Sequence, residues 1–265
     1  MKKTFENIKK YWNERAKLYV LNPKSTTDDY WLRIIEIKNL KKILSKIKNK
    51  KNILDIGCGD GFGTIQLAKR FSHSYFLGGD YSKEMIKVAK VRAKKERIKL
   101  GKNLNFKILD ITNLRDLNKK FEVIITDRCL INLPSRNLQE KAILEIYKTL
   151  APGGHYLMIE NFIEGHNNMN KLRRKLNLKE IPVRWHNIYL NNNFIKIVVS
   201  KYFSILKREN ISSIYYLITR VVYSRLCQLE KREPDYDHPI YEIAANLDLN
   251  LGDFGPINLF ILKKI

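Results

Sequence analysis

Short apolar runs alternate with amphipathic stretches through the middle of the chain. The runs at 52–56, 75–79, 104–109, 121–126 and 155–160 have the length and apolar content of buried strands. Amphipathic segments between them predict helices from the turn after residue 61 to about residue 71, over 82–97 and over 135–150. Repeated strand–helix alternation predicts an α/β fold built on a doubly wound, mostly parallel sheet.

The two ends of the chain depart from this alternation. Residues 1–50 predict two helices, over 5–20 and 28–47, which we interpret as an N-terminal helical cap. After residue 161 the pattern predicts helices over 165–176 and 211–229 and strands over 202–208 and 253–262. We therefore expect a ligand-binding domain over 51–265, in which a helical insertion around 165–250 covers the ligand face of the sheet.

A glycine-rich turn, Leu-Asp-Ile-Gly-Cys-Gly-Asp-Gly at 54–61, follows the first predicted strand. Alternating glycines let the backbone approach a ligand closely and tolerate positive φ. In an open parallel sheet, this turn lies at the carboxyl ends of the strands, where ligands bind. The spacing fits neither the G-x-G-x-x-G dinucleotide pattern nor a phosphate loop, which needs Gly-Lys-Ser/Thr.

Acidic residues end four successive predicted strands: Asp55, Asp80, Asp110 and Asp127. A carboxylate beside the glycine turn repels a pyrophosphate and suits a ligand with positive charge, and one after the second strand can accept both hydroxyls of a ribose. Asp110 and its apolar neighbour Ile111 can hold the edge and the face of an adenine. Together with the glycines, these acids predict a pocket for a nucleoside that carries an amino acid.

These segments resemble the class I S-adenosylmethionine (SAM)-dependent methyltransferases over 52–161. The resemblance rests on the glycine-rich turn, on Gly-Asp-Tyr-Ser at 79–82 with Met85 in the next helix, on Ile-Leu-Asp-Ile at 108–111, and on Leu-Ala-Pro-Gly-Gly at 150–154. It implies SAM as the cofactor and a seven-stranded sheet whose last strand is antiparallel. The residues that it places around SAM are Asp55, Gly57, Cys58, Gly59, Gly61, Asp80, Tyr81, Asp110, Ile111 and Asp127.

Methyl transfer from a sulfonium needs alignment of nucleophile, methyl group and sulfur, and an oxygen or nitrogen acceptor can also need a base. Our candidate base is His186, helped or oriented by Glu160, and Arg128 is a candidate to bind an anionic acceptor. A purely structural role stays open for all three. Further candidates for acceptor contacts are Asn132, Asn161, Arg184, Tyr216 and Arg220, the last two facing one way through their four-residue spacing.

The chain has 50 Lys and Arg against 27 Asp and Glu, a net charge of +23 over 265 residues. Such an excess accompanies binding to nucleic acid or anionic membranes. Compositional drift toward surface lysine explains it as well, and an acidic small substrate would also benefit from the field. Amino-methyltransferases of nucleic-acid bases carry Asn/Asp-Pro-Pro-aromatic after the fourth strand, but this chain has Asp-Arg-Cys-Leu at 127–130, which disfavours a nucleic-acid acceptor.

The three cysteines lack the spacing of zinc ligands, so we predict no metal site, and they suit a reducing compartment. No apolar stretch reaches the length of a membrane span and the charged start lacks a signal-peptide core, so we expect a cytoplasmic protein.

A narrower similarity, to methyltransferases of bacterial capsule and O-antigen polysaccharide clusters, is carried by the segments at 128–132, 184–187 and 215–220. It implies O-methylation of a small polar or anionic acceptor, such as a phosphorylated or nucleotide-linked sugar, or of a phosphoramidate group. An RNA methyltransferase that uses the basic surface and a SAM-binding protein without turnover are the alternative hypotheses.

Overall fold

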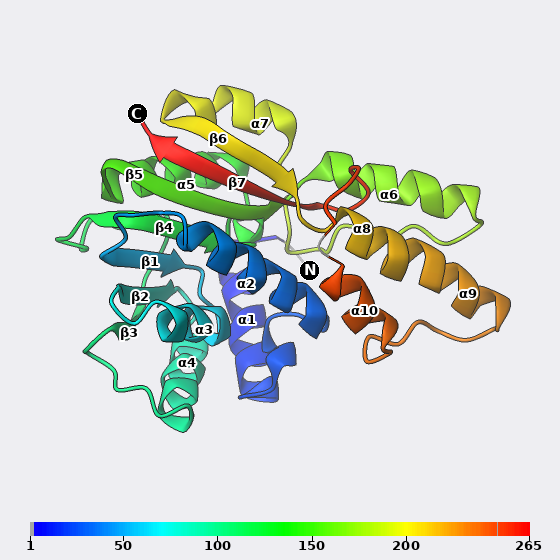
Figure 1. Cartoon of the computed structure of the whole chain (residues 1–265), viewed down its shortest axis with the longest axis horizontal. Coiled ribbons are helices and arrows are strands. Elements are labelled where there is room, and N and C mark those ends of the chain that lie inside the picture. Colours follow the sequence, from blue (N-terminus) through cyan, green and yellow to red (C-terminus); the bar gives the residue numbers. More distant parts are fainter. Residues whose placement is uncertain (1–2, 248) are drawn as a thin grey trace.

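A seven-stranded sheet in the order β3-β2-β1-β4-β5-β7-β6 forms the centre of the computed structural model, which describes residues 3–247 and 249–265 (Figure 1). The strands are β1 (Asn52–Ile56), β2 (Tyr75–Asp80), β3 (Leu104–Ile108), β4 (Phe121–Asp127), β5 (Leu150–Asn161), β6 (Phe203–Asn210) and β7 (Ile257–Lys264). Strands β1 to β5 are parallel, and β7 pairs antiparallel with both β5 and β6. The predicted fold class, the seven strands and the antiparallel last strand are confirmed.

Helices cover both faces of this sheet because side chains alternate along each strand. The α-helices are α1 (Phe5–Tyr19), α2 (Tyr30–Leu44), α3 (Phe62–Arg70), α4 (Lys83–Lys95), α5 (Arg136–Thr149), α6 (Ile163–Lys175), α7 (Asn192–Ile197), α8 (Ser213–Tyr216), α9 (Tyr223–Leu229) and α10 (Ile240–Asn246). In β1, Ile53 joins a core with α2, α3, α4 and α10, whereas Leu54 faces a second core with α5 and α7. Both side chains are fully buried, so the strand is held from both sides.

Short polar side chains begin three of the central helices. Ser82 accepts a hydrogen bond from the amide of Met85, and Ser135 accepts one from Leu138, so each serine side chain caps its helix. The cap of α2 is Asp29, whose carboxylate accepts from the amide of Leu32. The helix therefore begins at Tyr30, two residues after the predicted start.

Three predicted boundaries are corrected by the structure. The helix over 135–150 ends at Thr149, because strand β5 already begins at Leu150 and includes the Pro-Gly-Gly segment. The helix over 211–229 begins at Ser213 and contains a π-helical segment, η4 (Leu217–Val222). The last strand begins at Ile257 instead of residue 253 and extends to Lys264, where it pairs with β6.

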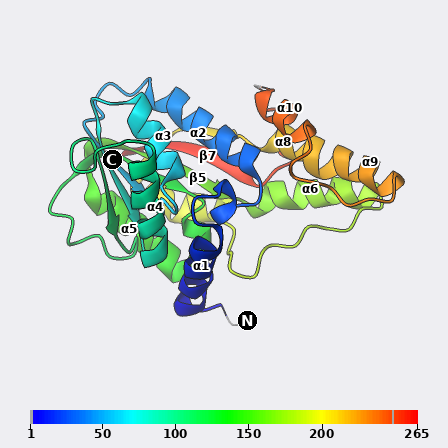
Figure 2. The same ribbon diagram turned by 90° about the horizontal axis from the view of Figure 1, so that it is seen from below.

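Most of the helices that follow the fifth strand extend the molecule beyond one end of the sheet, whereas α7 packs against the sheet itself. Figures 1 and 2 show α6, α8, α9 and α10 on this side, while α1 lies apart from them beside α4. Helix α2 packs between α3 and α10, so the N-terminal segment contacts both the sheet layer and the projecting helices. Within 3–247 and 249–265, no helix combines the length and apolar character needed to cross a bilayer.

Candidate functional site

A cavity of about 250 Å³ opens where the strand order reverses between β1 and β4. Ligands of open α/β sheets bind at this position, outside the carboxyl ends of the strands. The glycine-rich turn after β1 forms one wall. The amides of Gly57 and Cys58 donate to the carbonyl of Gly79 at 2.7 and 3.0 Å, which fixes the turn on the end of β2.

Two glycines of this turn leave room that no other residue would leave. Gly57 has φ +84°, and a Cβ there would lie 2.5 Å from Sγ of Cys129. Gly59 has φ +53°, and its Cβ would lie 2.8 Å from Cγ2 of Thr26. Both line the cavity, so backbone forms its surface there. Gly61 does not line it: this residue caps α3 and packs against Ala89 and Phe106, which corrects its predicted place at the ligand.

Three carboxylates, at the ends of β1, β2 and β4, line the same cavity; Asp55 and Asp80 are buried, and Asp127 is partly exposed. Asp80 accepts hydrogen bonds from the amides of Gly59 and Ser82 at 3.0 and 2.8 Å. Burial raises the pKa of Asp55 to about 7 and that of Asp80 to about 6. Burial also raises the pKa of Asp127. A cationic ligand group is therefore favoured here, because it would restore the charged form of these acids.

A smaller cavity of about 30 Å³ adjoins the first, and the two share Gly57, Tyr81, Cys129 and Asn132 in their walls. Asp110 and Ile111 line it together with apolar side chains. One wall is built by Phe5, whose ring centroid lies 5.2 Å from that of Tyr81. The combination of an apolar slot and one carboxylate can hold a flat heterocycle by its face and its edge.

Most of the predicted site residues meet in the larger cavity, although their segments are far apart in the sequence. The residues that line it are Asp55, Gly57, Cys58, Gly59, Asp80, Tyr81, Asp127, Arg128, Asn132, Asn161, Arg184, His186, Tyr216 and Arg220. Neither Gly61 nor Glu160 lines either cavity.

Arg128 stands in the cavity wall with its charge already matched. Its Nε lies 2.8 Å from Oε1 of Glu36 and 3.7 Å from Oδ1 of Asp127. The residue has φ +50°, a left-handed conformation that is unusual for arginine and turns the chain directly after β4. Arg128 is therefore already paired with two carboxylates, and its role in binding an anionic acceptor stays a prediction.

Glu160 has a structural role instead of the predicted one beside His186. Its carboxylate accepts hydrogen bonds from the amides of Cys129, Leu130 and Ile131 at 3.0, 2.8 and 3.3 Å. These amides belong to the first turn of the short helix η2 (Leu130–Asn132), where a carboxylate satisfies donors that lack helical partners. The predicted help of Glu160 to His186 is therefore wrong, and Glu160 fixes the turn after β4.

His186 lies in an aromatic niche at the cavity wall. Its ring stacks on Tyr11 at a centroid distance of 4.6 Å and contacts Trp12 and Trp185 edge-on. Burial, aided by nearby cationic side chains, lowers its pKa to about 4, so the ring is neutral at physiological pH. Among the described residues, no group hydrogen bonds with its buried Nδ1.

Tyr216 and Arg220 lie together as their spacing predicts, although the π-helical segment runs through them. The Arg220 guanidinium carbon lies 5.3 Å from the centre of the Tyr216 ring. Its Nη2 pairs with Oδ2 of Asp29 at 2.5 Å. Arg184, by contrast, is about half exposed and lies 3.5 Å from Asp28. Asn132 accepts from Trp12 Nε1 at 3.3 Å and from Asn187 at 3.2 Å, so it joins α1 to the 184–187 segment.

Helix α2 contributes three charged residues to the cavity that the sequence pattern did not single out: Asp29, Arg33 and Glu36. Their spacing of four and three residues places them on one helical face. This spacing could have predicted the three residues as one polar cluster. The apolar residues and the many lysines of the same helix made the cluster hard to recognise in the sequence. His166 and Tyr236 also line the cavity and were missed, because nothing in their local sequence distinguishes them.

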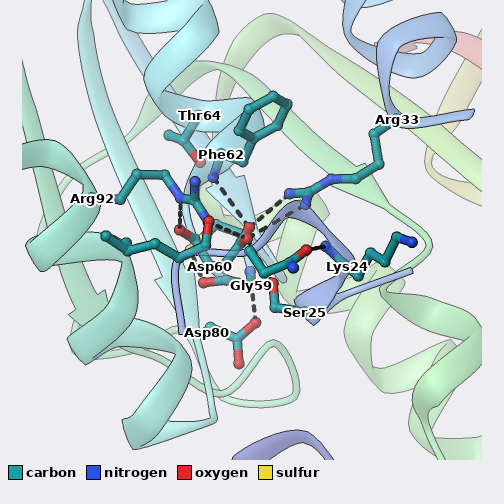
Figure 3. Close-up of polar contacts among 12 residues, drawn as sticks. Lys24, Ser25, Arg33, Gly59, Asp60, Phe62, Thr64, Asp80 and Arg92 are labelled. Atoms are coloured by element: carbon teal, nitrogen blue, oxygen red, sulfur yellow. Dashed lines mark hydrogen bonds and ion pairs between the residues drawn. The ribbon is translucent and has the colours of Figure 1, made fainter. Parts of the chain in front are cut away.

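Asp60, inside the glycine-rich turn, was missed as well. Figure 3 shows its fully buried carboxylate between Arg33 of α2 and Arg92 of α4, both 2.7 Å away, with Ser25 Oγ at 2.6 Å. Burial alone would raise the pKa of Asp60, but the two guanidiniums outweigh it and hold the pKa below its usual value. This hub fastens the N-terminal segment to the turn that lines the cavity.

Comparisons with known proteins agree with this geometry. The model of a family described as "methyltransferase domain" matches residues 47–217. The malonyl-[acyl-carrier protein] O-methyltransferase of Bacillus cereus is 30% identical over 156 residues, which are 55% of this chain and 54% of that protein. The chain spans about half the length of the curated relatives it matches.

Solved structures share the fold at low sequence identity. The N-methyltransferase NodS of Bradyrhizobium japonicum, in complex with S-adenosyl-l-homocysteine (SAH), aligns with a TM-score of 0.59 and 16% identity over 96% of this chain and 98% of that one. The magnesium protoporphyrin IX methyltransferase of Synechocystis, with bound SAH, aligns with a TM-score of 0.64 and 13% identity over 99% and 100% of the two chains. At these identities the comparison establishes the fold.

Proposed function

This chain belongs to the methyltransferase-domain family, within the class I SAM-dependent methyltransferases, and we propose that it transfers the methyl group of SAM to a small-molecule acceptor. One observation carries the proposal. The cavity at the switch point of the sheet is walled by the bare backbone of Gly57 and Gly59 and by carboxylates at three strand ends.

SAM fits the groups that this cavity presents. Asp55 and Asp127 would receive its ammonium and sulfonium charges, and Asp80 would accept the ribose hydroxyls in addition to its two backbone donors. The adjoining slot between Tyr81 and Ile111, with Asp110 at its edge, suits the adenine. SAM is the cofactor of the family and, when bound, supplies a methyl group on a positively charged sulfur.

The protein's own contribution is alignment, exclusion of water and proton transfer. Tyr11, Trp12 and Trp185 close the wall around His186, which keeps water from the reacting atoms. His186 is neutral above about pH 5 and lines the cavity, so its ring can accept the proton of an acceptor hydroxyl. A ring with so low a pKa takes that proton only as the oxygen bonds to the methyl carbon.

The acceptor that we propose is a small polar or anionic molecule methylated on oxygen. A precursor of surface polysaccharide is the candidate suggested by the narrower sequence similarity. Gene neighbourhood and a panel of phosphorylated and nucleotide-linked sugars, assayed with radiolabelled SAM, would test this choice. Transfer to RNA instead, weakened steeply by salt, would favour the alternative that uses the basic surface.

Calorimetry with SAH tests the cofactor assignment. We expect SAH to bind the wild-type protein and Asp80→Ala to weaken binding by roughly 1–3 kcal/mol, the scale for unmet polar contacts. Asp116→Ala is the matched control, because Asp116 is exposed and lines neither cavity. Absence of SAH binding to the wild type would refute the proposal. SAH binding without methyl transfer to any acceptor in the panel would favour a SAM-binding protein without turnover.

A further inference from the structure

We propose that the acceptor carries an anionic oxygen, as in a carboxylate, and that Arg220 Nη1 binds it inside the cavity. This proposal rests on the methyltransferase function and specifies the substrate class of the same site. It follows from one buried guanidinium, from the way its other contacts are arranged and from the apolar walls beside it.

Arg220 is buried among three aromatic rings. Only 8% of the residue is exposed, and its guanidinium carbon lies 5.3, 4.6 and 5.1 Å from the ring centres of Tyr216, Tyr236 and Tyr241. Aromatic faces stabilise a cation without accepting its hydrogen bonds in the plane of the guanidinium. The three rings therefore keep the charge in place and leave its N–H groups available.

Asp29 neutralises Arg220 only in part. Its Oδ2 accepts from Nη2 of Arg220, but its Oδ1 also accepts from the amide of Leu32 at 3.1 Å and from the hydroxyl of Tyr215 at 2.6 Å. Asp29 caps α2, and the positive end of a helix dipole already stabilises a carboxylate there. Much of the negative charge of Asp29 is thus matched by groups other than the guanidinium.

The Nη1 of Arg220 is buried without a hydrogen-bond acceptor anywhere in the described part of the chain. Leaving a charged donor unmet in the interior costs more than leaving a neutral one. Arg220 lies in the π-helical segment η4. Such segments are rare in proteins, and those that occur are often found at functional sites. Arg220 lines the cavity although Nη1 itself has no accessible surface, so a small shift of the side chain would let a ligand atom supply the missing acceptor.

The neighbouring wall selects the rest of the acceptor. Helix α6 packs against η4, and Met169, Ile181 and Pro182 line the cavity together with Tyr216. These side chains offer apolar and aromatic surface, which suits a flat or hydrophobic body next to the anionic group. An acceptor that joins a carboxylate to such a body satisfies both features.

The test compares benzoate with benzamide, which has the same shape and no charge, on protein saturated with SAH. We expect benzoate to bind saturably and benzamide to bind at least about tenfold more weakly, the effect of one charge-assisted hydrogen bond. Arg220→Lys keeps a cation beside Asp29 but removes the second nitrogen, and it should abolish this preference. The double variant Asp29→Asn with Arg220→Gln removes both charges of the ion pair, so no unpaired charge stays buried. It should also abolish the preference for benzoate over benzamide.

Arg225→Gln is the matched control, because Arg225 contacts Gln228 on α9, lines neither cavity and carries the same charge. It should leave the preference unchanged. Equal binding of benzoate and benzamide, no saturable benzoate binding, or a preference that survives in both Arg220 variants would each overturn this proposal. SAH affinity, measured on every variant, separates the two hypotheses: its absence in the wild type would refute the methyltransferase assignment itself.

Discussion

Nη2 of Arg33 in α2 lies 2.7 Å from Oδ1 of Asp60 in the glycine-rich turn. The same carboxylate binds Arg92 of α4, so one buried acid connects the N-terminal segment, the ligand-binding turn and the helix after β2. Because Arg33 also lines the cavity, the hub couples the stability of the fold to the geometry of the site.

We predict that Asp60→Asn lowers the free energy of unfolding by about 3–5 kcal/mol, because it removes the charge that faces two buried guanidiniums. Urea unfolding followed by circular dichroism measures this. The exposed pair of Lys24 and Asp237, 3.0 Å apart, provides the control, and Asp237→Asn should cost less than about 1 kcal/mol. Equal costs for the two variants would show that the hub does not stabilise the fold.

Gly57→Ala should abolish SAH binding and destabilise the protein more than Gly101→Ala. Both glycines have positive φ, so both alanines introduce backbone strain of about 1 kcal/mol. Only at Gly57 does the new Cβ meet a neighbour, Cys129 Sγ at 2.5 Å, whereas nothing lies within 4 Å at Gly101. Thermal unfolding and calorimetry of the pair isolate the steric effect. If the two variants behave alike, close packing against Cys129 is not the reason why position 57 requires glycine.

SAM affinity should rise as the pH increases from about 6 to 8. Asp55 and Asp80 have pKa values raised to about 7 and 6, so at pH 6 a cationic ligand must first displace protons from them. Binding should therefore release protons, which calorimetry in buffers of different ionisation enthalpy detects. SAH lacks the sulfonium charge and should depend on pH less. A pH-independent affinity for SAM would place its charges away from these two acids.

His186→Ala should slow methyl transfer by about 10²-fold or more while leaving SAH affinity unchanged, if the ring takes the acceptor proton. In the wild type at saturating SAM, kcat should fall as the pH drops toward about 4, where the folded ring becomes protonated. Initial rates with radiolabelled SAM measure both effects. Wild-type turnover in the variant would remove His186 from the mechanism.

The same histidine predicts a stability difference. Its folded pKa of about 4 lies below the ordinary value of 6.5, so between these pH values the unfolded state binds the additional proton. Stability should decrease as the pH falls from 6.5 to 4, and less so in His186→Ala. Chemical unfolding of both proteins at pH 7 and pH 4.5 gives the comparison. Parallel losses in the two proteins would show that His186 is not buried in its neutral form.

Local sequence patterns suffice to predict the sheet and the edge of the sheet at which the cavity opens. The apolar run of β1 can be read from five consecutive residues. The glycines around Gly57 indicate a turn in which the backbone packs too closely against its neighbours to leave room for side chains. Since parallel strands end at the same edge, acids at strand ends had to gather there. For this reason the sequence pattern alone identifies Asp55, Asp80 and Asp127 as residues of the site.

Which charges are available and which are already matched depends on the packed fold. Nothing near Glu160 in the sequence predicts that three amides of η2 occupy its carboxylate, and nothing near Arg128 reveals Glu36, which lies 92 residues away on α2. Likewise, only the packing of distant helices leaves Arg220 Nη1 buried without an acceptor among the described residues. Local pattern specifies secondary structure because its hydrogen bonds and side-chain period are local. The partners of a buried charge come from distant segments, so they exist only once the chain has folded.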